Sequence, residues 1–443
     1  MCQFVNRVAT LYPTKKNMKR GFYTIMAAQF FSSLADNALF VIAVALLRST
    51  QAPDWQAAAL VPMFALFYVV LAPWVGAFAD ARPKGQVMFI SNSIKVVGCL
   101  LMLWGSHPLL AYGVVGLGAA AYSPAKYGIL TELLPPSQLV KANGWIEGLT
   151  ITSIILGVVL GGVLVGPHIG PFLQSIDVPG ISLGIDTIEQ SALASMVLVY
   201  AIAAWFNTRI PRTDVALRPM PINPLNLMPD FYECNRRLWR DRLGQISLST
   251  TTLFWGVSGN LRYIVLAWAA VALNYTTTEA AKLVGVVAIG TAAGAIVASM
   301  WVRLDQACKV MPLGIGMGLL ILLLNYITSL WVAVPFLILL GALGGFLVVP
   351  MNALLQHRGH SLMGAGRSIA VQNFNEQACI LGLGLMYSAA TGAGVSAFAS
   401  IAGFGLCIAI VMYIIQRWHQ HNLRTHPQEL EVLLRQARDE PSH

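Results

Sequence analysis

The chain has 443 residues, of which 56% are hydrophobic and only 11% are charged, whereas about 25% are charged in a typical soluble domain. Its mean hydropathy is +0.66. These values exclude a soluble globular protein, because a folded chain of this size could not hide so much apolar surface from water. The net charge of +9 would suggest nucleic-acid binding in a soluble protein, but membrane topology explains it here and no nucleic-acid partner is expected.

Long apolar runs predict membrane-spanning helices, because about 18 uncharged residues suffice to span a bilayer and only helices or closed barrels satisfy their backbone groups in lipid. The runs are continuous rather than alternating, which favours helices. We expect twelve spans, at residues 22–47, 57–79, 86–104, 109–130, 143–166, 191–210, 244–273, 281–302, 310–328, 331–353, 365–390 and 394–417.

A polar, proline-rich stretch after the sixth span divides the chain into two sets of six. We therefore predict an N-terminal six-helix bundle (1–210), a cytoplasmic linker (211–243), a C-terminal six-helix bundle (244–418) and a cytoplasmic tail (419–443). The tail should contain an amphipathic helix, with Leu430, Val432, Leu433 and Leu434 as its apolar residues. With both termini in the cytoplasm, all but four of the 28 Lys and Arg residues fall in or near cytoplasmic segments, as the positive-inside rule requires.

Three features recur at nearly one offset in the two halves. Asn37 and Asn260 lie within the first and seventh spans. Gly-rich sequence leads into Pro124 in the fourth span and into Pro350 in the tenth, and each is followed by an Asn and then a Glu. A duplicated six-helix unit of this kind is the parallel-repeat architecture of the major facilitator superfamily. The predicted fold class is thus an all-α membrane protein with two six-helix bundles related by a pseudo-twofold axis.

The segment 76–85, between the second and third spans, resembles the cytoplasmic signature of the same superfamily. It has a Gly, an Asp four residues later and then a basic cluster, at Gly76, Asp80, Arg82 and Lys84. We expect Gly76 to permit close helix approach. Asp80 could cap a neighbouring helix or pair with a base across an inner gate.

Charged residues within spans are functional candidates, because a charge at mid-membrane costs at least about 2.5–3.5 kcal/mol on insertion scales. Four lie near span centres: Asp36, Lys95, Arg262 and Glu376. For Lys95 an ion pair between helices is the favoured interpretation. For the other three we favour a binding role, since Arg binds phosphate with a bidentate fork and a carboxylate can take an amine. Arg262 and Asp36 are expected to pair or to share one polar site.

The remaining chemistry-bearing residues predict no enzyme. The six cysteines are scattered without a CxxC pair, the histidines form no catalytic or metal-ligand grouping, and there is no phosphate-binding loop. We therefore expect no metal, no cofactor and no catalytic residue. Most tryptophans fall at span ends, as in an interfacial belt, although Trp255 and Trp268 flank Arg262 and could line a cavity.

Residues 122–128 (Tyr-Ser-Pro-Ala-Lys-Tyr-Gly) resemble the bacterial lysophospholipid transporter family of the major facilitator superfamily. Further matching segments are 35–39, 139–144, 253–256, 348–356 and 369–373. The longer outer loop 167–190 and the extended tail depart from that family.

The resemblance implies a flippase in the bacterial inner membrane. It would move lysophosphatidylethanolamine and related single-chain lipids from the outer leaflet to the cytoplasmic side. There a separate acyltransferase–acyl-carrier-protein synthetase would reacylate them. The implied charged transport residues are Asp36, Lys126, Arg262 and Glu376, and the uncharged polar residues Asn37, Gln372 and Asn373 complete the predicted substrate site.

Two alternatives stay open at this point. A drug or metabolite efflux carrier of the same superfamily has the same composition. A membrane-bound acyltransferase would need a His-Asp catalytic motif at the membrane face, and the sequence contains none.

Overall fold

The structure is a computed structural model and describes residues 15–174, 187–213 and 215–439. Throughout these residues the regular structure is helical. The helices of the first half are α2 (Lys15–Ser49), α3 (Asp54–Val70), α4 (Ala72–Ala81), α5 (Lys84–Leu103), α6 (Pro108–Leu133), α7 (Pro136–Leu164), α8 (Ile169–Gln174) and α9 (Ile188–Thr208).

The second half begins after a 3₁₀ turn, η1 (Pro224–Asn226), and the helix α10 (Leu227–Arg240). Its helices are α11 (Gly244–Ala272), α12 (Thr277–Trp301), η2 (Leu304–Val310), α13 (Pro312–Leu323), η3 (Leu324–Tyr326), α14 (Leu330–Met363), α15 (Ala365–Gly392), α16 (Ala397–Thr425) and α17 (Pro427–Asp439). Every one of the twelve spans expected from the sequence overlaps a helix.

The second expected span, 57–79, is broken rather than continuous. Helices α3 and α4 meet at Leu71 with a bend of 64°, and Pro73 lies in the first turn of α4. Proline is tolerated in a first turn, where its missing N–H would find no partner in the helix anyway. The break lets α4 turn at the end of the molecule that carries α10.

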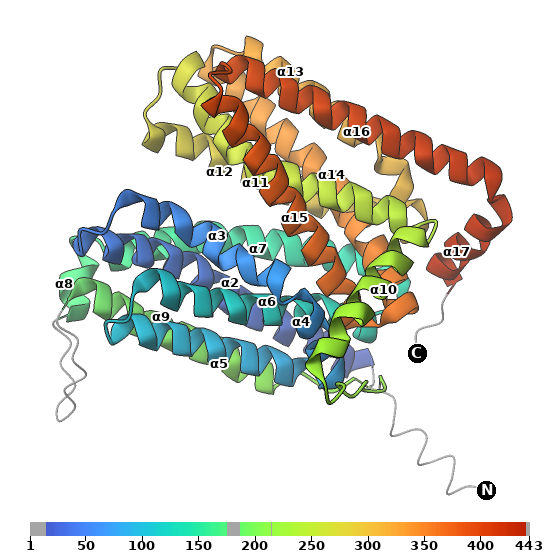
Figure 1. Ribbon diagram of the computed structural model, residues 1–443, viewed down its shortest axis with the longest axis horizontal. Coiled ribbons are helices and arrows are strands. Elements are labelled where there is room, and N and C mark those ends of the chain that lie inside the picture. Colours follow the sequence, from blue (N-terminus) through green and yellow to red (C-terminus); the bar gives the residue numbers. More distant parts are fainter. Residues whose placement is uncertain (1–14, 175–186, 214, 440–443) are drawn as a thin grey trace, which may run out of the picture.

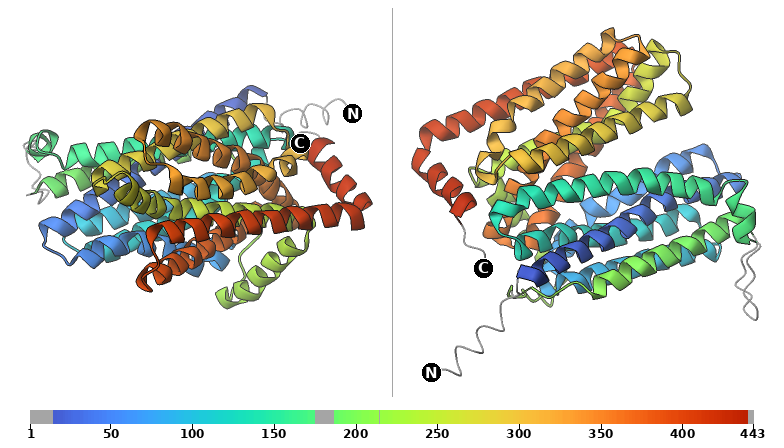
Figure 2. Two further views of the ribbon diagram at one scale, coloured as in Figure 1. Left: turned by 90° about the horizontal axis from the view of Figure 1, so that it is seen from above. Right: turned by 180° about the vertical axis from the view of Figure 1, so that it is seen from behind.

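The helices form two bundles that face each other across the molecule (Figures 1 and 2). In the first half α2 packs on α7 and α9, and α5 packs on α6 and α9. In the second half α11 packs on α15 and α16, and α13 packs on α14 and α16. These pairs correspond under the repeat seen in the sequence. The bundles touch mainly through α4 and α6 against α15, and through α7 against α12 and α14.

Eight helices in the described part of the chain are long and apolar enough to cross a membrane, or nine if α3 and α4 count as one bent span. Three others, α6, α11 and α15, have 26, 29 and 28 residues and are long enough. Their composition is more polar, which is the pattern expected of helices that line a polar cavity inside a bundle.

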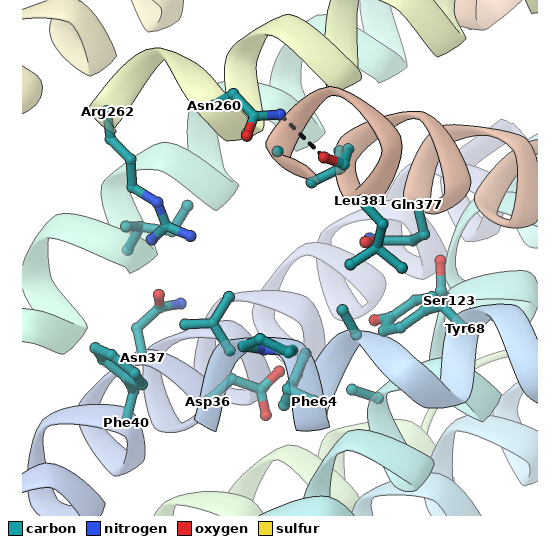
Figure 3. Close-up of a pocket in the computed structure, with 18 of the residues that line it drawn as sticks. Asp36, Asn37, Phe40, Phe64, Tyr68, Ser123, Asn260, Arg262, Gln377 and Leu381 are labelled. Atoms are coloured by element: carbon teal, nitrogen blue, oxygen red, sulfur yellow. Dashed lines mark hydrogen bonds between the residues drawn. The ribbon is translucent and has the colours of Figure 1, made fainter. Parts of the chain in front are cut away.

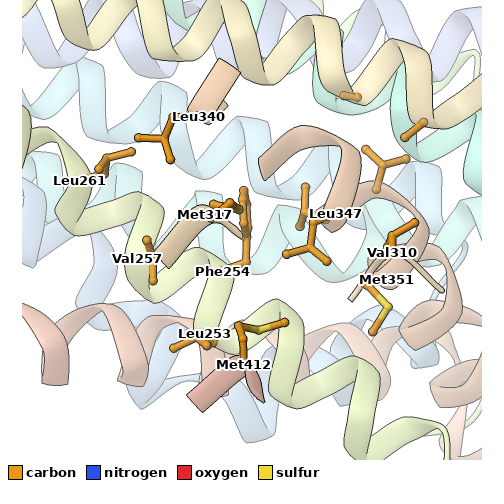
Figure 4. Close-up of a cluster of buried hydrophobic side chains, with 14 of the residues drawn as sticks. Leu253, Phe254, Val257, Leu261, Val310, Met317, Leu340, Leu347, Met351 and Met412 are labelled. Atoms are coloured by element: carbon orange, nitrogen blue, oxygen red, sulfur yellow. The ribbon is translucent and has the colours of Figure 1, made fainter. Parts of the chain in front are cut away.

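The largest apolar core lies in the second bundle, where aromatic, Leu and Met side chains of α11, α13, α14 and α16 interdigitate (Figure 4). Phe254 is at its centre, and Met317 and Met412 fill the space beside it. This core extends to α7 of the first bundle through Leu139 and Ile146. A smaller core holds α2, α5 and α9 together.

The linker and the tail add two helices at one end of the molecule, which we call the linker end (Figure 1). Helix α10 was not expected within the linker. The tail is helical as expected, but α16 continues to Thr425 and the separate helix begins only at Pro427. In α17 Leu430 and Ala437 are buried, whereas Val432, expected on the apolar face, is exposed.

Candidate functional site

A cavity of about 850 Å³ lies between the two bundles, lined by α2, α3, α5, α6 and α7 on one side and by α11 and α15 on the other. Figure 3 shows Asp36, Asn37 and Phe40 on one wall and Asn260 and Arg262 on the facing wall. The charged side chains among the described lining residues are Asp36, Lys95, Lys126 and Arg262. The cavity therefore has one acidic group and three basic groups.

Asp36 is engaged on both carboxylate oxygens. Lys95 Nζ of α5 donates to Oδ2 at 2.8 Å, and the Tyr200 hydroxyl of α9 donates to Oδ1 at 2.7 Å. Lys95 also donates to Ser32 Oγ at 3.0 Å. The Lys95 side chain is 1% exposed and that of Asp36 is 20% exposed. The ion pair expected for Lys95 is thus present, with Asp36 as its partner and as the member that faces the cavity.

Arg262 has a different environment. It forms no ion pair with any described residue; its guanidinium lies 5.1 Å from the ring centroid of Tyr263. Its buried Nε donates no hydrogen bond. Arg262 and Asp36 share one cavity, as the sequence suggested, but they do not form an ion pair. A guanidinium with open donors in a cavity is suited to an anionic group.

Lys126 lies in α6, two residues after Pro124, and its side chain is buried at the cavity wall. Its Nζ is 4.1 Å from the ring centroid of Tyr127, a distance at which an aromatic face stabilises a cation. The Tyr127 hydroxyl donates to Glu147 at 3.2 Å. Asn37 also lines the cavity, and its side-chain amide donates to the backbone carbonyl of Ser33 in the same helix.

The other three predicted site residues lie in α15 on the linker side of the cavity and are not among its lining residues. Gln372 Nε2 donates to Glu376 at 2.8 Å and to Asn352 at 2.9 Å. Asn373 donates to Ser123 of α6 at 2.9 Å. These three side chains form a polar layer between the cavity and the linker end.

The linker end is closed by Asp80, at the end of α4. Its Oδ1 accepts from the backbone N–H of Gly366 at 2.6 Å, and its Oδ2 accepts from that of Arg367 at 3.1 Å. Arg367 Nη1 also lies 3.4 Å from Oδ2. Asp80 therefore both caps α15 and pairs with a base of the other bundle, the two geometries suggested by the sequence.

Lys84 and Gly76 complete this contact. Lys84 Nζ lies 3.1 Å from both Asp80 and Glu132, and its side chain is buried. A Cβ at Gly76 would lie 2.8 Å from Ala370 Cβ and 3.1 Å from the backbone of Arg367, so glycine permits the close approach. Arg82, by contrast, is exposed and lies over the ring of Phe78.

A second polar contact closes the same end between α7 and α14. Asn143 and Gln356 exchange two hydrogen bonds of 2.9 Å, with both side chains buried. At the other end of α15, the lining residues Leu385, Ser388 and Thr391 are exposed. The cavity is therefore sealed toward the linker end and open at the opposite end.

Part of the cavity wall was not anticipated. Aromatic side chains of the first half contribute much of it: Phe40, Phe64, Tyr68, Tyr112 and Tyr122. Tyrosines within spans, away from the expected interfacial belt, are the sequence signal that could have identified three of them. Trp255 and Trp268 are not lining residues, since Trp268 is fully buried in the core of the second bundle and Trp255 packs against that core.

Two facing helical bundles around a cavity with charged and aromatic walls, closed at one end and open at the other, define a membrane carrier. The family model of the Major Facilitator Superfamily matches residues 25–375. A crystal structure of the superfamily transporter FucP in the outward conformation has a TM-score of 0.66 at 15% identity, covering 90% of this chain and 98% of that one. A bacterial homologue of the iron transporter ferroportin, in an outward-facing state, has a TM-score of 0.65 at 17% identity, covering 90% and 99%.

Sequence relatives are more specific. The lysophospholipid transporter LplT of Pectobacterium carotovorum is 39% identical over 87% of this chain and 90% of its own length. The protein of the same name from Yersinia enterocolitica is 40% identical over 84% and 87%. The chain therefore belongs to the Major Facilitator Superfamily and, within it, to the family of the lysophospholipid transporters LplT.

Proposed function

We propose that this protein moves lysophospholipids, chiefly lysophosphatidylethanolamine, from the outer leaflet of a bacterial inner membrane to the cytoplasmic side. The observation that carries the proposal is the cavity with a carboxylate on one wall and, on the other, a guanidinium that pairs with no described residue. Membership of a family whose relatives are named lysophospholipid transporters supports the same substrate class.

The orientation follows from the basic residues. The linker end carries Arg218, Arg236, Arg237 and Arg240 of the linker together with Arg435 of the tail, and short segments rich in Lys and Arg remain in the cytoplasm. With the linker end inside, both termini are cytoplasmic and the open end of the cavity faces the outer leaflet. The closed contact at Asp80 then acts as the inner gate.

The headgroup chemistry fits the two walls. The phosphate would bind Arg262, whose fork offers free donors, with Lys126 as a second cation deeper in the cavity. The ethanolamine ammonium would bind the edge of Asp36 that faces the cavity. Asn37 lies beside Asp36 and offers a further polar group, while the aromatic wall contacts the glycerol and the first acyl carbons.

Transport requires the seal to move. Opening of the linker end would separate Asp80 from α15 and Asn143 from Gln356, and the polar layer of Gln372, Asn373 and Glu376 would then face the moving headgroup. Because the two bundles are internally well packed, rocking of one bundle against the other is the expected motion. Reacylation on the cytoplasmic side would fall to a separate acyltransferase–acyl-carrier-protein synthetase.

The test is uptake of labelled lysophosphatidylethanolamine into spheroplasts that carry the protein or the variant Arg262→Gln. We expect the variant to lose at least about tenfold in uptake, because each lost charge-assisted hydrogen bond is worth about 1.5–3 kcal/mol. Lys282→Gln is the matched control, since Lys282 is exposed at the start of α12 and far from the cavity lining.

Uptake of a soluble cationic drug by the same spheroplasts separates the proposal from an efflux carrier. Wild-type transport of the drug without transport of the lipid would contradict the proposed function. Wild-type lipid uptake in a well-expressed Arg262→Gln protein would instead remove Arg262 from the site.

A further inference from the structure

The ion pair between Asp36 and Lys95 sets the charge that the cavity presents to its substrate. Lys95 lies behind Asp36, inside the first bundle, with its side chain 1% exposed, whereas the Asp36 side chain is 20% exposed toward the cavity. Lys95 reaches the cavity lining, but its side chain is covered, so a substrate meets mainly the carboxylate of Asp36.

The position of Lys95 is tightly determined. Its Nζ donates to Asp36 at 2.8 Å and to Ser32 at 3.0 Å, and it lies 5.0 and 5.6 Å from the ring centroids of Tyr122 and Tyr200. Ser32 in turn donates to Asn92 at 2.8 Å. Gly118 leaves room for the lysine stem, because a Cβ there would lie 2.7 Å from Lys95 Cγ.

Such a buried pair need not stabilise the fold, and apolar residues of similar size often serve as well. A buried pair whose acidic member faces a binding cavity has a second effect, on the ligand. A lone carboxylate in this wall would attract any cationic amphiphile. When Lys95 offsets its charge, the same carboxylate can still accept a hydrogen bond from one ammonium. It then does not repel the phosphate of the same headgroup.

We propose that Lys95 is the specificity-determining residue of the cavity: by pairing with Asp36 it makes the site accept a zwitterionic phosphate headgroup and reject single-chain cations. Lys95 acts through Asp36 and does not touch the substrate, so it is a positioning residue. The Tyr200 hydroxyl holds the other carboxylate oxygen in place but carries no charge. This inference rests on the proposed function, because it assigns the headgroup ammonium to Asp36.

The experiment compares purified wild-type protein with Lys95→Met, Lys95→Arg and Asp36→Asn/Lys95→Met. Binding of lysophosphatidylethanolamine, lysophosphatidylglycerol and dodecyltrimethylammonium is measured in nanodiscs, and uptake in spheroplasts. In Lys95→Met we expect dodecyltrimethylammonium to bind at least about tenfold more tightly and lysophosphatidylethanolamine uptake to fall at least about tenfold. Lys95→Arg keeps the charge and should retain the wild-type preference.

The double variant guards against a folding defect, because it removes both charges together. It should fold, lose the gain in cation binding, and carry lysophosphatidylglycerol, which has no amine, better than lysophosphatidylethanolamine. Lys282→Met, at an exposed position, is the matched control.

Unchanged cation binding in Lys95→Met, or wild-type headgroup preference in the double variant, would overturn the inference and leave the pair a structural one. Failure of the proposed function is a separate result: wild-type protein would then bind neither lysophospholipid.

Discussion

The carboxylate of Asp80 joins the two halves at the closed linker end through its contacts with α15, while Lys84 holds it from within its own half. It accepts two backbone N–H bonds at the start of α15 and lies within reach of Arg367 and Lys84. Hydrogen bonds to a charged group contribute about 1.5–3 kcal/mol, more than neutral ones. A carboxylate at a helix N-terminus also benefits from the helix dipole.

Asp80→Asn should shift the protein toward the state that is open at the linker end. The amide keeps the shape and one acceptor but loses the charge, so we expect a change of about 1–2 kcal/mol, or about 5–30-fold in population. Spin labels at Lys141 and Arg303, exposed on opposite halves at the linker end, report the opening as a longer inter-label distance.

The labels lie away from Asp80, so a local disturbance at α4 would not move them. Arg82→Gln is the control, because Arg82 belongs to the same segment but is exposed and makes no ion pair with a described residue. An unchanged distance distribution in Asp80→Asn would mean that other contacts hold the linker end closed.

At single positions, the sequence identified which charges are unusual but not which charges meet. The cost of a charge in the membrane singled out Asp36, Lys95, Arg262 and Glu376. Helical periodicity does not fix how neighbouring helices are rotated. Asp36 therefore turned out to pair with Lys95 rather than with Arg262, and Glu376 has an amide, Gln372, as its hydrogen-bond donor rather than a base.

At the scale of elements, α17 connects the two halves at the linker end. It packs on η2 and α16 of the second bundle and on α7 of the first. Leu430 and Ala437 are almost fully buried. Its polar contacts join Arg438 to Asp305, Gln436 to Arg358 and Glu429 to Arg242, so they reach the second bundle and the end of the linker that leads into it. The contact with α7 is therefore the part that must break when the linker end opens.

Ending the chain at Thr425 should consequently favour opening. Burial of one leucine contributes about 1.5–3 kcal/mol. Only the part of this burial that is due to α7 is lost on opening, so we expect the population of the open state to rise several-fold to tenfold. Spin labels at Arg82 and Ser361, exposed on the two halves, measure it.

Glu431→Gln, an exposed substitution in α17, should leave the distances unchanged. A truncated protein with the wild-type distribution would show that α17 only covers the second bundle and does not hold the halves together.

The elements themselves were largely predictable, because lipid demands long apolar helices and the twelve expected segments are helical. The bend between α3 and α4 was not predictable. Pro73 lies inside the expected span 57–79, and a proline inside a helix permits either a kink or a break. Helix α10 was not predicted, because the prolines around it favoured an irregular linker. Its sequence is amphipathic, and the apolar side, with Cys234 and Leu238, is buried against α11, α14 and α15.

At the scale of the whole molecule, the network of Asp36 bears on how transport is driven. A proton-coupled carrier needs a carboxylate in the membrane that gains and loses a proton during the cycle. The Asp36 carboxylate is the partner of the buried Lys95 ammonium, and a buried charge that loses its partner is strongly unfavourable. Glu376 has no ion pair with a described residue, so it is the one carboxylate of the predicted site that could take this role.

The substrate itself supplies a driving force. Reacylation converts a single-chain lipid into a two-chain lipid that no longer fits a single-chain path, so inward flux can run downhill without coupling. We therefore expect uptake of lysophosphatidylethanolamine to continue, within about twofold, when a protonophore collapses the proton gradient. The measurement uses spheroplasts that contain the acyltransferase, with ATP for the acyltransferase maintained and its activity checked in parallel. If the protonophore abolished uptake while reacylation of lipid already inside continued, transport would be proton-driven. Glu376→Gln would then be the variant expected to lose the dependence on the proton gradient.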